Sequence, residues 1–341
     1  MEKKRYANID LLKTVAILMV IALHSQLFKL DFIQYNNISS YIQYFLRIIC
    51  EGVAIFILVN GFLLINKKEF DIKRHLLKIL RIFILLILWS IILTTVIKLI
   101  YQEPLKISEI IKNIFVIDIN NKYTGVLWFL QSLIALYLIY PVLKILHDKD
   151  KKVYDYLFIV VLIFTMGTNL LSIISELINT KIKCNAINLV ISYMSNFQVL
   201  YNRNFLIFFM LGGYLFENKE KFEERKTRRK WIVIGLVSWI IAFAFAVIIS
   251  KSQNKTYMQN FNYGSIFMPF ILIGIFAATY NYKSKEKWYN KIIIIRIINS
   301  LYTGQLSLPL RICKVIIVFI VSLMITLLIK KIPKVKKLVE L

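Results

Sequence analysis

The run Ile79–Tyr101 reads ILRIFILLILWSIILTTVIKLIY and contains one arginine and one lysine. At 1.5 Å of rise per residue, about 20 residues of α-helix cross the roughly 30 Å of hydrocarbon in a bilayer. Runs of similar length and composition recur along the chain. A soluble domain with a single membrane anchor is therefore excluded, and the sequence predicts an all-α, polytopic transmembrane helical bundle.

The composition of the chain agrees with that prediction. Of 341 residues, 58% are hydrophobic and 18% charged, whereas a soluble domain is closer to half apolar and a quarter charged. The segments between the apolar runs are short, which predicts one transmembrane domain over residues 1–341 without a separate soluble domain. The cysteines show no CxxC spacing, and no metal site is expected. They are Cys50, Cys184 and Cys313.

About ten membrane spans are expected, eight of them clear and two weaker. The first follows a basic start but lacks a small-x-small cleavage site, which favours a retained signal-anchor helix. The weaker two are Ile292–Leu308, which is interrupted, and Ile312–Ile329. The clear spans are Ile9–Phe28, Tyr44–Ile65, Ile79–Tyr101, Val126–Leu146, Val153–Leu171, Val199–Phe216, Trp231–Ile249 and Gly264–Tyr280.

The formal net charge of +25 comes largely from Lys and Arg in patches between the apolar runs. Such patches orient spans at the cytoplasmic face, so nucleic acid is not an expected partner. Every second loop is basic, which predicts that both termini are cytoplasmic. A Lys-rich tail rarely crosses a membrane, which favours ten spans over nine. The patches lie at Lys3–Arg5, Lys67–Arg74, Lys149–Lys152, Arg225–Lys230, Lys283–Lys287 and Lys330–Lys337.

The first span contains three ionisable residues, Asp10, Lys13 and His24. A charge in the hydrocarbon costs about 2.5–3.5 kcal/mol by insertion scales. Each of these ionisable residues therefore needs a structural or functional explanation. At 3.6 residues per turn all three share one helix face, with His24 roughly 16 Å further out than Lys13. Asp10 and Lys13 lie near a helix end, where the side chains can extend to the interface and the free-energy cost of their charges is small. His24 is a candidate general base, with a structural histidine as the alternative.

Residues of three later spans fall at a depth near that of His24. Arg47 and Glu51 form an i,i+4 pair on one face of the second span. Glu51 is a candidate catalytic carboxylate, and a purely structural ion pair with Arg47 is the alternative. The candidate substrate contacts are Arg47, Trp128 in the fourth span and Arg203 in the sixth.

Residues 8–24 read NIDLLKTVAILMVIALH, so Ile-Asp is followed by Lys13, ten residues and His24. This pattern resembles the signature of the acyltransferase-3 family, membrane O-acyltransferases of bacterial surface polymers, with Lys in place of the commoner Arg. A departure is Asn299–Ser307, which is shortened and lacks the family's usual His. Other segments resemble family motifs in order: Ile55–Leu64, with Asn60 for Ser; Lys78–Ile82; Leu127–Leu130; and Phe208–Tyr214.

The resemblance implies a reaction. Acyl-CoA, in particular acetyl-CoA, would be the cytoplasmic donor, with Lys78 and Arg81 holding its phosphates and Lys13 contributing from the same level. His24 would act as general base or transient acyl carrier. The acceptor would be a hydroxyl of a lipid-linked or extracellular glycan at the bacterial cytoplasmic membrane. No SGNH-type domain follows, so a separate envelope protein is a possible partner.

Two other functions fit the sequence. A glycan flippase or exporter would also place charges inside a helical bundle, and it predicts transport without acyl-CoA binding. A non-catalytic accessory membrane protein fits the missing His of the penultimate span.

Overall fold

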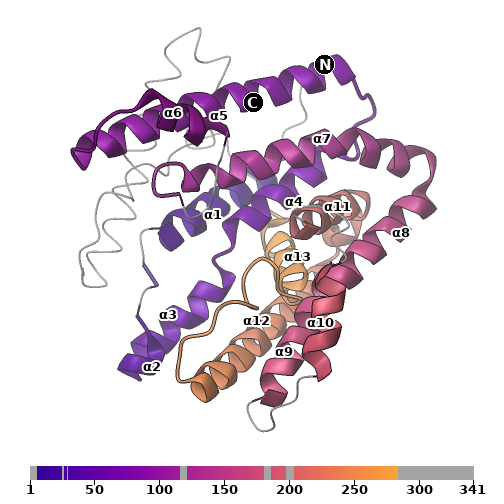
Figure 1. Ribbon diagram of the computed structural model, residues 1–341. Coiled ribbons are helices and arrows are strands. Elements are labelled where there is room, and N and C mark those ends of the chain that lie inside the picture. Colours follow the sequence, from indigo (N-terminus) through magenta and orange to yellow (C-terminus); the bar gives the residue numbers. More distant parts are fainter. Residues whose placement is uncertain are drawn as a thin grey trace. The chain divides into compact units, whose positions relative to one another are not determined.

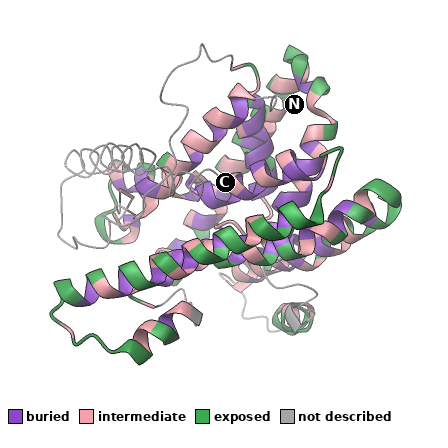
Figure 2. Cartoon of the chain, turned by 90° about the horizontal axis from the view of Figure 1, so that it is seen from above, coloured by how far each residue is buried: buried purple, intermediate pink, exposed green. Residues whose placement is uncertain are grey.

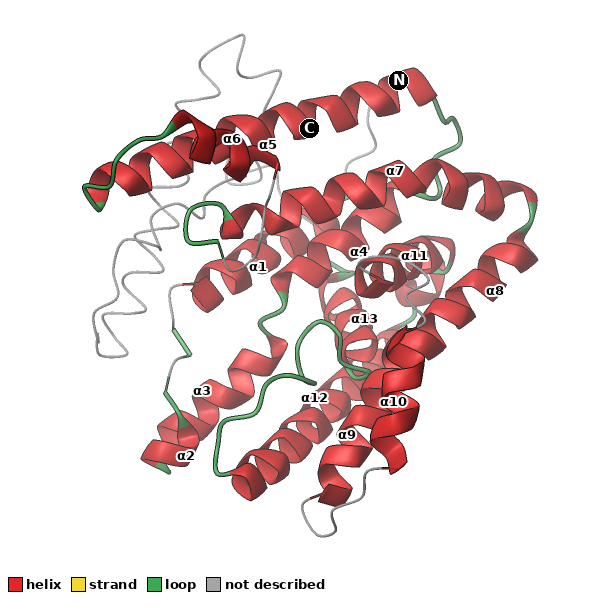
Figure 3. Ribbon diagram, viewed as in Figure 1, coloured by secondary structure: helices red, strands yellow, loops and turns green. Residues whose placement is uncertain are grey.

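The computed structural model describes residues 6–24, 27–28, 30–115, 121–179, 186–196 and 203–282. These residues form helices joined by loops, and no strand occurs among them (Figures 1 and 3). The helix class is therefore as predicted. The last two expected spans, Ile292–Leu308 and Ile312–Ile329, lie outside the described residues, so the number of spans and the side of the termini stay predictions.

Six helical segments are long and apolar enough to cross a membrane, and two shorter apolar helices accompany them. This makes the chain a multi-pass membrane protein. The long segments are Ala7–His24, Ile38–Leu64, Ile72–Ile100, Trp128–Lys149, Lys151–Asn179 and Arg225–Gln253, and the shorter helices are Asn204–Glu217 and Met268–Thr279. Each corresponds to one of the eight clear spans expected from the sequence.

Contacts between residues divide the chain into two units, which are described separately. Within the described residues, the first unit comprises 6–66 and 150–282. Its helices are α1 (Ala7–His24), α2 (Phe32–Tyr35), α3 (Ile38–Ile49), α4 (Gly52–Leu64), α8 (Lys151–Leu162), α9 (Thr168–Asn179), α10 (Ala186–Asn196), α11 (Arg203–Glu217), α12 (Arg225–Gln253) and α13 (Met268–Thr279). A π-helical turn, Ile163–Gly167, joins α8 to α9, and a 3₁₀ turn, Lys219–Glu223, lies between α11 and α12.

Backbone-to-backbone packing holds the centre of the first unit. α4 lies between α1 and α11, and glycines let the helices touch. A Cβ on Gly61 would lie 1.8 Å from the carbonyl oxygen of Phe209, and one on Gly212 would lie 2.0 Å from that of Leu58. In a membrane, where lipid tails are as apolar as Leu, such close approach is a main source of helix association.

The second span is not the continuous helix that the sequence predicted. α3 ends at Ile49 and α4 begins at Gly52. Cys50 and Glu51 between them have ψ angles of 48° and 55°, which are not helical. The helical i,i+4 relation of Arg47 to Glu51 is therefore lost. Non-helical backbone at membrane depth is tolerated where protein buries it or where it lines a cavity.

Aromatic side chains fix α3 against α12. The Trp239 indole stacks on Phe45 with centroids 4.0 Å apart and donates a hydrogen bond of 2.8 Å to the Phe45 carbonyl oxygen. One residue earlier, the Tyr44 hydroxyl donates to the Tyr257 carbonyl oxygen in the loop after α12. The end of α3 that bears Arg47 is therefore held in place from one side.

Within the described residues, the second unit comprises 67–115 and 121–149. It contains α5 (Ile72–Ile100), α6 (Ile107–Phe115), a 3₁₀ turn (Gly125–Leu127) and α7 (Trp128–Lys149). α5 packs on α7, and α6 folds back on the end of α5.

The surface of α5 is typical of a lipid-facing helix. Figure 2 shows bands of exposed and buried residues along the long helices. On α5 the exposed side includes large apolar side chains at helical spacing, among them Leu80, Ile84, Leu88 and Ile91. Contact between such a stripe and lipid tails costs no free energy, whereas contact with water would be unfavourable.

Candidate functional site

α1 carries the central predicted residues, Lys13 and His24. Both are half-buried, and His24 is the last residue of the helix. Asp10 lies in the first turn, where a carboxylate is favoured by the helix dipole. The rise of 1.5 Å per residue keeps Lys13 and His24 about three turns apart along the helix axis.

Glu51 lies at the break between α3 and α4, beside α1. The next residue, Gly52, packs so closely that a Cβ there would lie 2.2 Å from the Ala16 carbonyl oxygen and 3.0 Å from Val20 Cγ2. Glu51 therefore lies beside the stretch of α1 between Lys13 and His24, about one helical turn from His24 toward Lys13. Its side chain is half-buried and does not cap α4.

The helix ends at the break favour the two opposite charges of Arg47 and Glu51. Arg47 is in the last turn of α3, and Glu51 precedes the first turn of α4. A helix C-terminus favours a cation and an N-terminus an anion. The Nε of Arg47 is buried and has no hydrogen-bond partner within the part of the chain that the structure describes. Arg47 thus presents an unused donor near Glu51.

The remaining predicted residues separate into the two units. Arg203 is the first residue of α11 in the first unit, and its side chain lies outside the described part. Trp128 begins α7 in the second unit and is half-buried. Lys78 and Arg81 are on α5 of the second unit. The structure thus brings Lys13, His24, Arg47 and Glu51 into one unit, and Lys78, Arg81 and Trp128 into the other.

The two cations on α5 differ in their surroundings. Lys78 is half-buried, with its Nζ 4.8 Å from the centroid of the Tyr137 ring on α7. Such a cation–π contact restrains the ammonium group without neutralising it. Arg81 is exposed. Lys78 is therefore held by the protein, while Arg81 presents its guanidinium outward.

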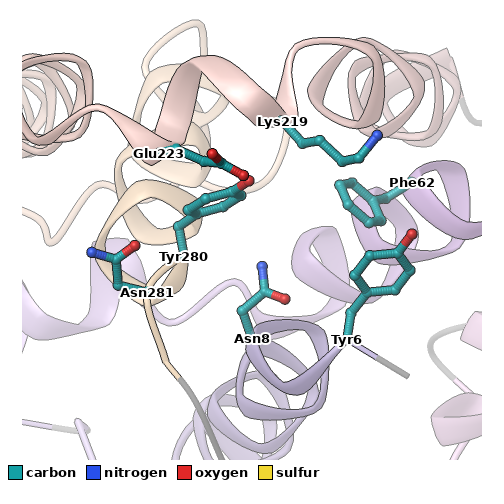
Figure 4. Close-up of a pocket in the computed structure, with 7 residues that line it drawn as sticks. All are labelled: Tyr6, Asn8, Phe62, Lys219, Glu223, Tyr280 and Asn281. Atoms are coloured by element: carbon teal, nitrogen blue, oxygen red, sulfur yellow. The ribbon is translucent and has the colours of Figure 1, made fainter. Parts of the chain in front are cut away.

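A pocket of about 500 Å³ lies at one end of the first unit (Figure 4). That volume is within the range of small-molecule sites. Tyr6, Phe62 and Tyr280 supply aromatic rings, Asn8 and Asn281 supply amides, and Lys219 and Glu223 supply one charge of each sign. Figure 4 shows Tyr6, Phe62 and Lys219 on one side, with Glu223 and Tyr280 next to each other on the other.

Ring contacts build the walls of this pocket. Phe62 lies 5.8 Å from Tyr6 and 5.1 Å from Phe216 between centroids. Lys219 Nζ lies 4.0 Å from the Phe216 centroid, which holds this cation at the rim. The pocket can therefore take a planar, polar ligand that carries negative charge near Lys219.

Sequence reasoning missed the pocket residues. They come from the start of α1, the end of α4, the turn after α11 and the end of α13. Four separate segments contribute, and each has one or two unremarkable residues. The alternation of basic loops does assign all four to the cytoplasmic face. This shared cytoplasmic location could be predicted from the sequence, but it does not show that the four helix ends lie next to one another.

These helices and this pocket define a multi-pass membrane protein with an internal charged site and a pocket at one end. The family model for the acyltransferase-3 domain, described as an acyltransferase domain, matches residues 6–330. The chain therefore belongs to the acyltransferase-3 family and is a membrane acyltransferase. No curated protein and no solved structure matches it significantly.

Proposed function

We propose that the protein transfers an acyl group, acetyl in the first instance, from acyl-CoA to a hydroxyl of a cell-surface or lipid-linked glycan. The observation that carries this proposal is the pocket, because its four wall segments are all expected at the cytoplasmic face, where acyl-CoA is available. Family membership over residues 6–330 supports one acyltransferase domain that includes both units.

Each unit has its own proposed donor contacts. In the second unit, Lys78 and Arg81 would bind phosphate groups of acyl-CoA. In the first unit, Lys13 on α1 would be a further phosphate contact. The pocket would take the nucleotide end, with its base among Tyr6, Phe62 and Tyr280 and a phosphate at Lys219. Charge-assisted contacts to phosphate are the strongest that such side chains make.

His24 would carry the chemistry. As general base, its imidazole takes the proton of the acceptor hydroxyl while the oxygen attacks the thioester carbonyl carbon. The C–O bond forms, the C–S bond breaks, and the CoA thiolate takes the proton from the imidazolium. As a transient acyl carrier, the His24 imidazole would attack the thioester carbonyl carbon and expel the CoA thiolate, which takes the imidazole N–H proton. The acceptor oxygen would then attack the acylimidazole, the C–N bond would break, and the hydroxyl proton would return to the imidazole. Glu51, one turn deeper, would stabilise the imidazolium.

The acceptor would bind nearer the outer face. Arg47, whose Nε is buried without a partner among the described residues, would donate to a sugar hydroxyl. Trp128 would supply an aromatic surface for the sugar and Arg203 a further cation. Transfer to an external polymer would then be completed by this chain or with a separate envelope protein.

Mass spectrometry of surface glycan tests the reaction. Cells with the gene should show acetyl increments that cells without it lack, and His24→Ala should abolish them at a normal level of membrane protein. His147→Ala is the matched control, because His147 pairs with Asp148 at the end of α7. An unchanged glycan in the deletion strain, or full acetylation by His24→Ala, would contradict the proposal.

Acetyl-CoA titration of purified protein tests the pocket. Lys219→Ala should weaken binding about 10- to 100-fold, since a charge-assisted contact contributes about 1.5–3 kcal/mol. Lys221→Ala, an exposed lysine in the same 3₁₀ turn that does not line the pocket, should bind as wild type. Equal affinities for the two variants would place the nucleotide elsewhere.

We further propose that the protein lies in the bacterial cytoplasmic membrane with both termini inside. A reporter fused after Leu341 should be active as a cytoplasmic reporter and silent as an external one. The reverse result would mean an odd number of spans.

A further inference from the structure

α7 has a gap in its backbone hydrogen bonding. Pro141 lies inside the helix and has no backbone N–H. The carbonyl oxygen of Tyr137, four residues earlier, therefore loses the donor that a continuous α-helix would supply. An unpaired carbonyl group away from water is costly, so a substitute donor is expected.

His75 of α5 supplies that donor. Its Nε2 lies 2.7 Å from the Tyr137 carbonyl oxygen, and because a carbonyl can only accept, the nitrogen carries the proton and donates. The side chain is buried, at 7% exposure. The rings of Phe70, Tyr137 and Tyr140 surround the imidazole at centroid distances of 5.1–5.8 Å. The bond thus ties α5 to α7 at one defined register.

The same register places Lys78. Lys78 is three residues after His75, so it lies on the same side of α5 one turn further along. Its Nζ is over the ring of Tyr137, the residue whose carbonyl His75 holds. Rotation or sliding of α5 against α7 would break the histidine bond and move Lys78 off the ring.

We propose that His75 is a positioning residue for the acyl-CoA donor: by donating the hydrogen bond that Pro141 leaves open, it holds Lys78 in place for the donor's phosphates. This inference rests on the proposed donor site at Lys78. His75 touches neither donor nor acceptor, and it acts through the pairing of the two helices.

The test compares acetyl-CoA affinity with thermal stability in purified full-length protein. His75→Leu removes the donor and should weaken acetyl-CoA binding about two- to tenfold, the value of one hydrogen bond. It should also lower the melting temperature by about 2–4 °C. His75→Gln, whose side-chain amide can donate, should recover part of both.

The double variant His75→Leu/Pro141→Ala distinguishes two roles of His75: holding α5 against α7, and donating a hydrogen bond to the Tyr137 carbonyl oxygen. Replacing the proline restores a backbone N–H at position 141, which can donate to the Tyr137 carbonyl oxygen, so the melting temperature should recover. The tie between the helices stays absent, so acetyl-CoA binding should remain weak. Recovery of both quantities would overturn the proposal, because His75 would then serve only the carbonyl group.

Measurements in the Lys78→Ala variant show whether His75 acts through Lys78, separately from whether Lys78 binds the donor at all. There, His75→Leu should weaken acetyl-CoA binding no further, because the residue that it positions is gone. A full additional loss would overturn positioning through Lys78. If Lys78→Ala and Arg81→Ala both bind acetyl-CoA as wild type, the proposed donor site at α5 is itself wrong, whatever the melting temperatures show.

Discussion

The two units of the molecule hold their helices together by different means. In the first, glycines let the backbone of α4 approach the backbones of α1 and α11 closely. In the second, side chains join α5 to its neighbours: His75 donates to the carbonyl of Tyr137 on α7, and Thr94 accepts from Asn113 on α6. Glycine contacts leave no room for change, whereas each side-chain contact is a single removable interaction. Substitutions at the glycines where α4 meets α11 should therefore have steep effects, and substitutions at the side-chain contacts of α5 should have graded effects.

The largest effect is expected for Gly61→Ala. The new methyl would lie 1.8 Å from the Phe209 carbonyl oxygen, and backbone atoms on both helices would have to move. We expect a loss of about 5 kcal/mol or more, beyond the ~1–3 kcal/mol of ordinary overpacking. Fluorescence-detected size exclusion of a tagged protein should show little or no folded species.

Gly167→Ala is the matched control for that substitution. Its methyl would lie 3.9 Å from Ile163 Cγ2, an ordinary contact. It should give a wild-type profile. Two similar profiles would show that α4 and α11 can separate without loss, and the comparison between the units would fail.

A smaller effect is expected where α12 meets α13. A Cβ on Gly235 would lie 3.0 Å from Gly274 Cα and 3.1 Å from the Phe270 carbonyl oxygen. The helices need to move by only a few tenths of an ångström, so Gly235→Ala should cost about 1–3 kcal/mol. Melting in detergent should show a lowered transition. Adding Gly274→Ala should cost more than the sum of the single changes, because the two methyls face each other; strict additivity would argue against this contact.

The spans were predictable because hydropathy reports the hydrocarbon thickness directly. Their ends were not, because helices continue into the polar interface. α5 begins at Ile72 rather than Ile79, with the Asp71 side chain accepting a hydrogen bond from the Arg74 backbone. α12 likewise begins at Arg225, six residues before the predicted apolar start. Asp71 is a polar N-cap that was visible in the sequence, but a search for apolar runs does not detect it.

The break in the second span could not be predicted. Cys50, Glu51 and Gly52 interrupt a long apolar run without a proline, and the run reads as one helix. At the break, Gly52 lies against Ala16 of α1, a contact between residues far apart in sequence that the apolar run does not reveal. From the sequence, His24 and Glu51 were expected at a similar depth and Lys13 about three helical turns away; that they act in one reaction stays a prediction. The pocket needed the fold, since its walls come from four separate helix ends.

Within the second unit, Asn113→Ala should have a moderate effect. The buried Asn113 amide donates to Thr94 Oγ1 at 3.3 Å and accepts from Asn121 at 2.9 Å. Losing both bonds should cost about 1–2 kcal/mol, and Thr94→Val, which removes one, about half as much. Lys112→Ala, on the exposed side of α6, is the control. Melting temperatures should fall in that order; a collapse as complete as that of Gly61→Ala would erase the distinction between the units.

The smallest effect is expected at the loop between α5 and α6. Glu103 accepts hydrogen bonds from Lys122 and from the Tyr123 hydroxyl, and these bonds lower the pKa of the Glu103 carboxyl. A lowered pKa means that the pair stabilises the folded state at neutral pH and loses that contribution as the pH falls below the ordinary carboxyl pKa and through the lowered one. Because Lys122 is exposed and Glu103 is only half-buried, Glu103→Gln should change the melting temperature at pH 7 by little more than the error of measurement, and less in high salt. The difference from wild type should vanish in acid. A shift as large as that of Asn113→Ala, or one that grows as the pH falls, would show that this ion pair is a principal contact of the second unit rather than a peripheral one.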